Sequence, residues 1–250
     1  MSPRRSGSHP PGPSPRFPDD CVQSLIDEWW TVAENREVRR GQLLWAHAPF
    51  FDYLPYDLVP EARSATTEHE RALFYLEQRR LSQRRAGPRL PVAALPQNPG
   101  ETYSVYRAKF RPVLVLGTGG VEVDPTLTQR AARWQSVRTY LVAPYFGVDR
   151  TSQRGGWNLE FVRRIRHCEY PQYFWDMLPL GASASESVLR LDQIQPIGQN
   201  HEAFEYTPHR LSNEGLEVLG EWVDWNFSED LDPGSMLHIA REEFSALSQT

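Results

Sequence analysis

The sequence has very little cysteine, almost no lysine and no long apolar run. Cys21 and Cys168 are the only two cysteines in 250 residues, and they lie far apart. This excludes a disulfide framework or a cysteine-rich metal site and predicts two buried, reduced thiols. No apolar run approaches the roughly 18 residues of a membrane span, and no apolar stretch follows the N-terminal arginines as in a secretory signal. We therefore expect a globular cytoplasmic protein.

The charge is carried almost entirely by arginine and by acidic residues. The formal net charge is −5, which excludes a chain that binds nucleic acid through an overall positive charge. Lys109 is the only lysine, and this arginine bias together with 21 prolines is typical of a GC-rich bacterial genome. Arginine stays charged at any relevant pH and pairs bidentately with phosphate.

The first part of the chain predicts a tail, a helix, one strand and an insertion. Residues 1–18 are rich in Pro, Ser, Gly and Arg and predict a disordered tail. Apolar residues at helical spacing predict a helix over 20–34, within an N-terminal segment of residues 19–36. A short strand is expected at 42–47. An insertion at 51–108 is expected to hold a helix over 66–84, anchored by Leu73 and Leu76.

The second part predicts a series of strands followed by two helices. Strands are expected at 111–117, 138–147, 158–167 and 187–198, and helices at about 212–228 and 234–247. This order predicts a mainly β (α+β) fold, a small barrel over 37–228 with helical decoration and a helical extension at 229–250. Arg111 should be partly exposed at the start of its strand, with Val113 and Val115 on its face and Leu114 and Leu116 turned into the core.

Several common site motifs are missing. Gly117, Gly119 and Gly120 lead into a Val-Glu-Val-Asp-Pro segment rather than a helix, so they do not form a dinucleotide-binding turn. His201 and His209 are not spaced as two ligands on one helical turn, and no nucleophile elbow is present. We therefore expect no metal and no cofactor.

Four segments in order resemble the MazF/PemK family of toxins from bacterial toxin–antitoxin pairs. The first holds an Arg-Gly pair and a tryptophan, the second an Arg-Pro followed by aliphatic residues, the third a Val-x-Pro, and the fourth precedes a helix. The matching positions are Arg40, Gly41 and Trp45; Arg111 to Leu116; Val142 to Pro144; and Ser187, Val188, Gln193, Ile194 and Ile197.

The resemblance implies an SH3-like barrel with a C-terminal helix, a homodimer and an antitoxin partner. It also implies growth inhibition through metal-independent cleavage of single-stranded RNA. In this family the arginine at the strand start is a catalytic or phosphate-stabilising group, which points to Arg111. The chemistry is self-consistent, because the RNA 2′-OH attacks its own phosphate when a proton acceptor, a proton donor and a cation are supplied.

The chain departs from the family in three places. Gln42 replaces an acidic residue, and the insertion at 51–108 replaces a short loop. Tyr145 and Phe146 stand where the family has an aliphatic residue and a threonine. Tyr145 could donate a proton, although Tyr145 and Phe146 fit a place in the core equally well. A lengthened loop could supply Thr151 and Ser152 instead, and these alternatives stay open.

RNA-binding residues are expected on either side of this site. Phe146 could stack a base, and Arg150 together with Arg79, Arg80 and Arg84 could follow the RNA backbone, although the last three also fit a solvated helix face. His47 is a candidate acid or base, or else a half-buried structural histidine. The alternative function is a catalytically inactive barrel that binds protein or nucleic acid.

Overall fold

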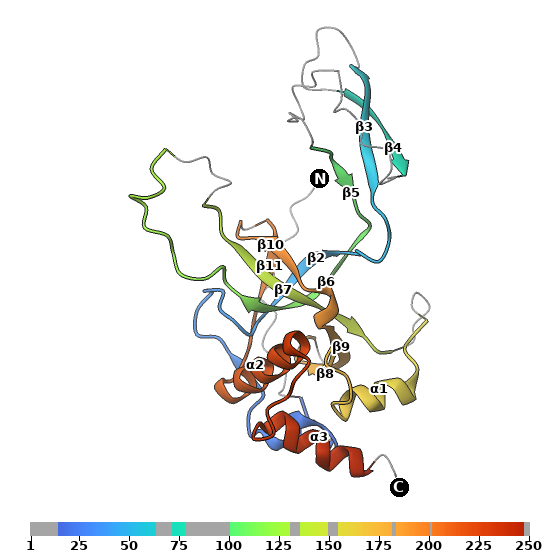
Figure 1. Cartoon of the computed structure of the whole chain (residues 1–250), viewed down its shortest axis with the longest axis vertical. Coiled ribbons are helices and arrows are strands. Elements are labelled where there is room, and N and C mark those ends of the chain that lie inside the picture. The colour runs from blue at the N-terminus through green and yellow to red at the C-terminus, as the bar shows by residue number, and fades with distance from the viewer. Residues whose placement is uncertain are drawn as a thin grey trace. The chain divides into compact units, whose positions relative to one another are not determined.

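The computed structural model describes residues 15–63, 72–78, 101–130, 136–149, 155–181, 184–200 and 202–247. The chain divides into two compact units, Met1–His47 with Phe110–Thr250, and Ala48–Lys109. Figure 1 labels the helices and strands of both units.

The first unit contains an eight-stranded antiparallel sheet. Its order is β1-β11-β2-β6-β7-β9-β8, and β10 pairs with β7. The strands are β1 (Trp30–Val32), β2 (Gln42–Pro49), β6 (Ala108–Gly117), β7 (Thr139–Gly147), β8 (Tyr173–Leu178), β9 (Ser185–Arg190), β10 (Gln195–Gly198) and β11 (Phe204–Leu211). The predicted strands at 42–47, 111–117 and 138–147 are confirmed, and the one predicted at 187–198 is divided between β9 and β10.

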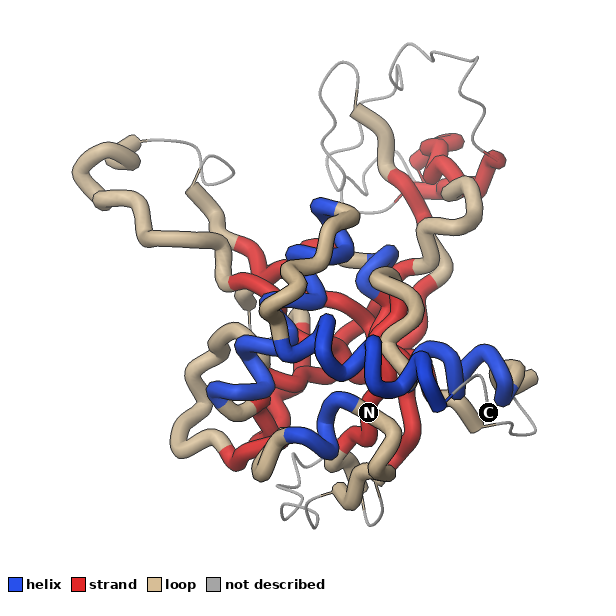
Figure 2. Tube along the Cα trace, turned by 60° about the horizontal axis from the view of Figure 1, so that its bottom comes forward, coloured by secondary structure: helices blue, strands red, loops and turns tan. Residues whose placement is uncertain are grey.

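Helices lie over the strands of this sheet (Figure 2). They are α1 (Leu159–Arg166), α2 (Asn213–Ser228) and α3 (Met236–Leu247), with short 3₁₀ helices η1 (Val22–Leu25) and η3 (Leu191–Gln193). The two predicted C-terminal helices are confirmed. The side chain of Ser212 caps α2 by accepting the backbone N–H of Gly215, which satisfies one otherwise unpaired donor of the first turn.

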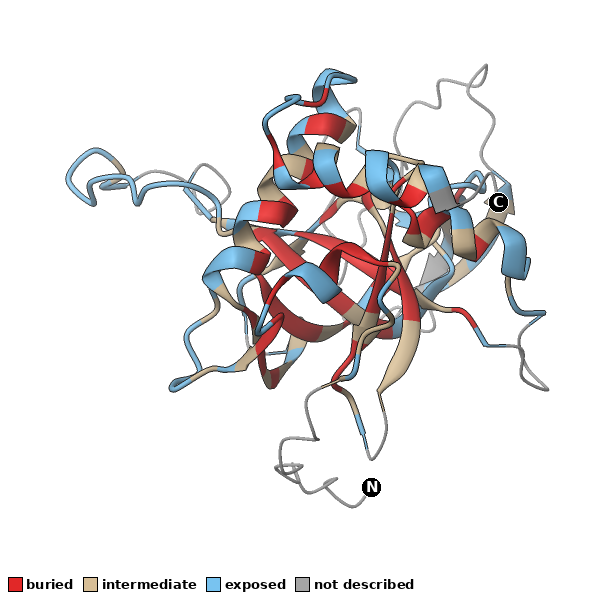
Figure 3. Ribbon diagram, turned by 90° about the horizontal axis from the view of Figure 1, so that it is seen from below, coloured by how far each residue is buried: buried red, intermediate tan, exposed pale blue. Residues whose placement is uncertain are grey.

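The core of this unit has a part on each face of the sheet. Leu114 of β6 packs with Trp222 of α2 and Phe244 of α3 in the largest cluster, whereas Val113 and Val115 belong to a separate cluster. Alternate residues of β6 therefore serve different clusters, as the period of a strand requires. Figure 3 shows the buried residues gathered in the strands and on the inner sides of the helices. Cys21 and Cys168 are buried and free, as predicted.

The two edge strands of the sheet are joined by side chains. The indole Nε1–H of Trp30 on β1 donates to Met177 O at 3.1 Å and to Asp176 Oδ1 at 3.3 Å, both on β8. Gln23 Nε2 donates to Trp175 O on the same strand at 2.5 Å. Among the described strands no backbone ladder joins β1 to β8, so the predicted closed barrel is not found. The fold is mainly β with three helices, an α+β class.

The second unit contains a three-stranded sheet of order β4-β3-β5. Its strands are β3 (Tyr56–Arg63), β4 (Ala72–Gln78) and β5 (Ser104–Val105). The helix predicted over 66–84 is therefore wrong at 72–78, where β4 pairs antiparallel with β3. Leu73 and Leu76, predicted to anchor that helix, are 53% and 55% exposed.

Two further elements differ from the prediction. The helix expected over 20–34 is η1 followed by the strand β1, because Trp30 pairs with Leu211 of β11 at the sheet edge. The strand expected at 158–167 is α1. Asn158 caps this helix by accepting the Phe161 N–H, and Glu160 in the first turn and Arg163 in the last favour it through the helix dipole.

Gly41 is a position where the fold needs glycine. Its φ is +80°, and an added Cβ would lie 2.5 Å from Leu216 Cδ2 and 3.3 Å from Leu211 Cβ. Gly120 has a similar φ of +75° but nothing within 4 Å of an added Cβ. Both positions would carry the strain of a left-handed alanine, and only Gly41 would also crowd the core.

We therefore expect Gly41→Ala to lower the free energy of unfolding by about 1–2 kcal/mol more than Gly120→Ala. Urea unfolding followed by tryptophan fluorescence measures both. Equal losses for the two variants would show that the core adjusts to the added methyl group without cost.

Candidate functional site: an arginine–aromatic cluster

Arg111 is placed by β6 and packs on the neighbouring strand β7. Its Cζ lies 3.8 Å from the centroid of the Phe146 ring, and its Nη1 donates to Tyr145 O at 3.4 Å. The residue is only 7% exposed, so the prediction of a partly exposed Arg111 is wrong. The strand, the face shared with Val113 and Val115, and the inward turn of Leu114 agree with the prediction. A guanidinium held over a ring is fixed in orientation and partly desolvated, which strengthens its attraction to an anion.

A second arginine approaches the same phenyl ring from β9. The Cζ of Arg190 lies 5.5 Å from the Phe146 centroid and 5.1 Å from the Tyr173 centroid. Register explains the arrangement, since Phe146 pairs with Val188 and Tyr173 pairs with Arg190 across neighbouring strands. Arg190 also forms an ion pair with Asp192, which orients its guanidinium.

Aromatic side chains continue the row from Tyr173 to α1. The Phe161 ring lies 5.4 Å from Tyr173 and 5.2 Å from Tyr170, and stacks on Trp157 at 6.0 Å. Arg164 lies over Tyr170, with its Cζ 5.3 Å from the ring centroid. The four rings are partly exposed. We call this row the arginine–aromatic cluster; its members are Arg111, Phe146, Arg190, Tyr173, Phe161, Trp157, Tyr170 and Arg164.

Tyr145 lies in the core rather than in the cluster. It is 2% exposed, and its hydroxyl donates to Asp176 Oδ2 at 2.9 Å. Burial, followed by the charge of Asp176, raises the pKa of Tyr145 well above its ordinary value. The phenol therefore has a structural partner, and this position does not support the role of proton donor to a substrate.

His47 lies on the other face of the sheet from Arg111. Its side chain is exposed, and its ring lies 5.1 Å from Phe110, which also stacks on Trp45 at 5.5 Å. Because Phe110 and Arg111 are successive residues of β6, their side chains leave opposite faces of the strand. The structure therefore does not bring His47 and Arg111 to a common site.

The remaining predicted residues lie outside the described part of the chain. These are Thr151, Ser152, Arg150, Arg79, Arg80 and Arg84. The described residues that flank 150–154 are hydrogen-bonded to each other, since Trp157 N donates to Val148 O at 3.2 Å.

Most of the cluster was missed by the sequence analysis. Arg190, Tyr173, Phe161, Trp157, Tyr170 and Arg164 were not singled out. One signal was present: Asn158 is a capping residue, so a helix beginning after it places Phe161 in the first turn, with Trp157 directly before the cap. The approach of Arg190 and Tyr173 to Phe146 depends on strand register and had no local signal.

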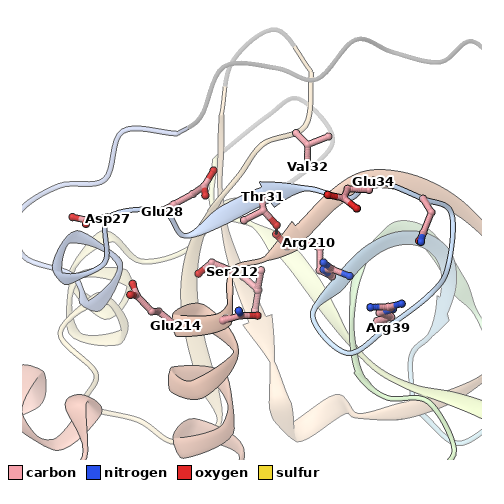
Figure 4. A pocket seen from close by; sticks show the side chains of 12 residues that line it. Asp27, Glu28, Thr31, Val32, Glu34, Arg39, Arg210, Ser212 and Glu214 are labelled. Atoms are coloured by element: carbon pink, nitrogen blue, oxygen red, sulfur yellow. Dashed lines mark hydrogen bonds between the residues drawn. The ribbon is translucent and has the colours of Figure 1, made fainter.

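A separate pocket lies beside β1 and the start of α2, with a volume of about 560 Å³. Figure 4 shows Asp27, Glu28 and Glu214 toward one end and Arg39 and Arg210 toward the other. With Glu34, its carboxylates outnumber its arginines. This balance disfavours an anionic ligand, so we place no nucleic-acid site there.

The described residues contain no group of three or more His, Cys, Asp or Glu side chains arranged to hold a metal ion. Within the described part of the chain, no helix is long and apolar enough to cross a membrane. Comparison of the chain with protein-family models and with curated proteins gives no match.

Proposed function

We propose that this protein binds single-stranded RNA at the arginine–aromatic cluster. The observation that carries the proposal is the convergence of two guanidiniums, those of Arg111 and Arg190, on the Phe146 ring. Arginine pairs bidentately with phosphate, and aromatic rings stack unpaired bases at about 1–3 kcal/mol per base. The cluster combines both kinds of group, and a single RNA strand offers phosphates to the arginines and unpaired bases to the rings.

Single strands suit this surface better than a duplex does. The rings of the cluster are reached only by bases that are free to leave a stack. The overall charge of −5 also argues against a protein that covers a long duplex backbone. A local group of arginines contacts few phosphates, so we expect the affinity to depend only weakly on salt.

Phe146→Leu tests the stacking. Leucine keeps apolar volume in contact with Arg111 but offers no aromatic face, so the affinity for a short labelled RNA of mixed sequence should fall by about fivefold or more. Fluorescence anisotropy in EDTA measures the affinity. Phe227→Leu is the control, because Phe227 is a 68% exposed phenylalanine of α2 outside the cluster.

Two results would overturn the proposal. One is wild-type protein that does not bind the RNA. The other is a Phe146→Leu variant that binds as tightly as wild type and Phe227→Leu. Circular dichroism of each variant separates a loss of binding from a loss of fold.

Metal-independent RNA cleavage is the second candidate. The favouring observation is that the Arg111 guanidinium is held in place by Phe146 and Tyr145 O, as a preorganised cation for phosphorane charge must be. Incubating the same RNA in EDTA and mapping its ends tests this function. Loss of cleavage in a Thr151→Ala, Ser152→Ala double variant would identify the hydroxyl.

The MazF/PemK resemblance supplies the rest of the proposal. On its basis we propose an SH3-like arrangement of the sheet, a homodimer, an antitoxin that neutralises the protein, and action in the cytoplasm. Each of these rests on the motif matches at Arg40, Arg111 to Leu116, Val142 to Pro144 and Ser187 to Ile197.

A further inference from the structure

A second pocket, unlike the first in being lined by more arginines than carboxylates, lies beside the arginine–aromatic cluster between α1, α3 and the segment after α1. Its volume is about 600 Å³, within the range of pockets that hold small ligands. Its lining includes Arg163, Arg164 and Arg241 together with Tyr170 and Ser245. Tyr170 and Arg164 belong to both the pocket and the cluster, so the two surfaces are continuous.

The arginines of this pocket are held in place from different sides. Arg163 pairs with Glu160 at 2.8 Å, and Arg164 pairs with Glu169 at 2.6 Å. Arg241 comes from α3, where its Cζ lies 5.1 Å from the Trp225 ring. Guanidiniums fixed in this way lose little side-chain freedom when an anion arrives.

The charge of the pocket favours an anion. Three arginines stand against two glutamates among the lining residues, which leaves a net positive charge. The hydrogen bond from Arg163 lowers the pKa of Glu160, so both partners are charged at neutral pH. The Glu160 side chain is 62% exposed and can turn toward water when a stronger acceptor takes its place.

From this geometry we propose that the pocket binds a terminal phosphate of the RNA strand that lies on the cluster. A terminal monophosphate carries more charge and more free oxygens than an internal phosphodiester, so it gains more from three guanidiniums. The hydroxyl of Ser245 adds a neutral donor, and Tyr170 provides a ring on which the terminal base can stack. The inference rests on the proposed RNA binding and specifies which RNA ends the protein prefers.

The test compares one RNA sequence in three forms: with hydroxyls at both ends, with a 5′-phosphate, and with a 3′-phosphate. Phosphorylation of one end should tighten binding by about tenfold, as expected for charge-assisted hydrogen bonds. Arg241→Gln should remove that gain and leave the affinity for the hydroxyl-ended RNA unchanged. Arg39→Gln, an exposed arginine of the other pocket, is the matched control and should keep the gain.

The outcomes separate this inference from the proposed function. Equal wild-type affinity for all three RNAs would overturn the phosphate site and leave RNA binding intact. If the hydroxyl-ended RNA does not bind, the proposed function fails, and titration with inorganic phosphate and a nucleoside monophosphate then decides whether the pocket holds free anions. A wild-type gain that persists in Arg241→Gln would also overturn the assignment. Phe146→Leu should weaken binding of all three RNAs equally.

Discussion

Relative to an Asp176→Asn variant, the wild-type protein is expected to lose about 4 kcal/mol of unfolding free energy as the pH rises from about 4 to about 8. Asp176 is 0% exposed, and burial raises its pKa from 3.8 to about 7. Between these two values the folded state holds a proton that the unfolded state has released. Stability is therefore fully present below about pH 4 and is lost as the pH rises to about 7.

The neighbours of Asp176 explain why its carboxylate is tolerated at all. It accepts the Tyr145 hydroxyl at 2.9 Å, the Met177 N–H at 2.7 Å and the Trp30 indole N–H at 3.3 Å. These donors lower the pKa of Asp176 and oppose burial, which has the larger effect. The carboxylate thereby links β7, β8 and β1 at the place where the sheet edges meet.

Asparagine keeps the size of this side chain and most of its hydrogen bonds. Its carbonyl can accept from Met177 and Trp30, and its amide can donate to the Tyr145 oxygen. Asparagine does not titrate, so the pH-dependent part of the difference in unfolding free energy between the two proteins comes from Asp176. Burial raises the pKa of Cys21 to about 12, outside the measured range.

Urea unfolding at a series of pH values measures the difference. Asp224→Asn, at an exposed position of α2, serves as the control and should follow wild type at every pH. If the difference in unfolding free energy between wild type and Asp176→Asn stays constant from about pH 4 to about pH 8, the prediction is contradicted. Tyr145→Phe should increase the loss, because it removes a donor to the charged form.

Arg111→Ala is expected to weaken RNA binding by about tenfold or more and, if the protein cleaves RNA, to lower the cleavage rate by about 10²–10³-fold. The guanidinium is the group of the cluster held closest to the Phe146 ring. Arg111→Lys should recover only part of either activity, since an ammonium lacks the planar fork and stacks less well. Anisotropy and single-turnover cleavage in EDTA measure the two effects.

Burial adds a structural cost that the sequence did not indicate. Because Arg111 is 7% exposed and packs on Phe146, its removal leaves a gap beside the ring. The alanine variant should therefore also unfold at lower urea concentration than wild type. Arg39→Ala, at an exposed arginine outside the cluster, should change neither stability nor binding. Unchanged RNA affinity in a folded Arg111→Ala variant would remove Arg111 from the site.

Local signals identified the elements in which several cues agree. The aliphatic run after Arg111 ends at Gly117, and β6 covers it. Ser212 stands at the capping position before an apolar helical period, and α2 follows. Local cues conflict in the segment after Asn158: its partial alternation predicts a strand, but its cap and its charge order favour the helix α1, which the structure shows.

Two other segments were decided by their partners. The 72–78 segment contains good helix formers, yet it pairs with β3 and becomes β4. Trp29 fits the helical period expected over 20–34, yet the next residue, Trp30, pairs with β11 and its indole donates to β8. Intrinsic preferences of a few tenths of a kcal/mol per residue are easily outweighed by such pairing and burial.

The central strands β6 and β7, the helices α2 and α3 and the buried thiols were predictable from the sequence alone, because each depends on residues close together in the chain. Three features of the site depend on tertiary packing: Arg111 is buried against Phe146, the Tyr145 hydroxyl donates to Asp176, and His47 lies on the opposite face of the sheet. This packing also brings Arg190 and Tyr173 to the Phe146 ring. These contacts follow from the register of β6, β7, β9 and β8, which is fixed by the packing of the whole sheet, and no local pattern of residues encodes it.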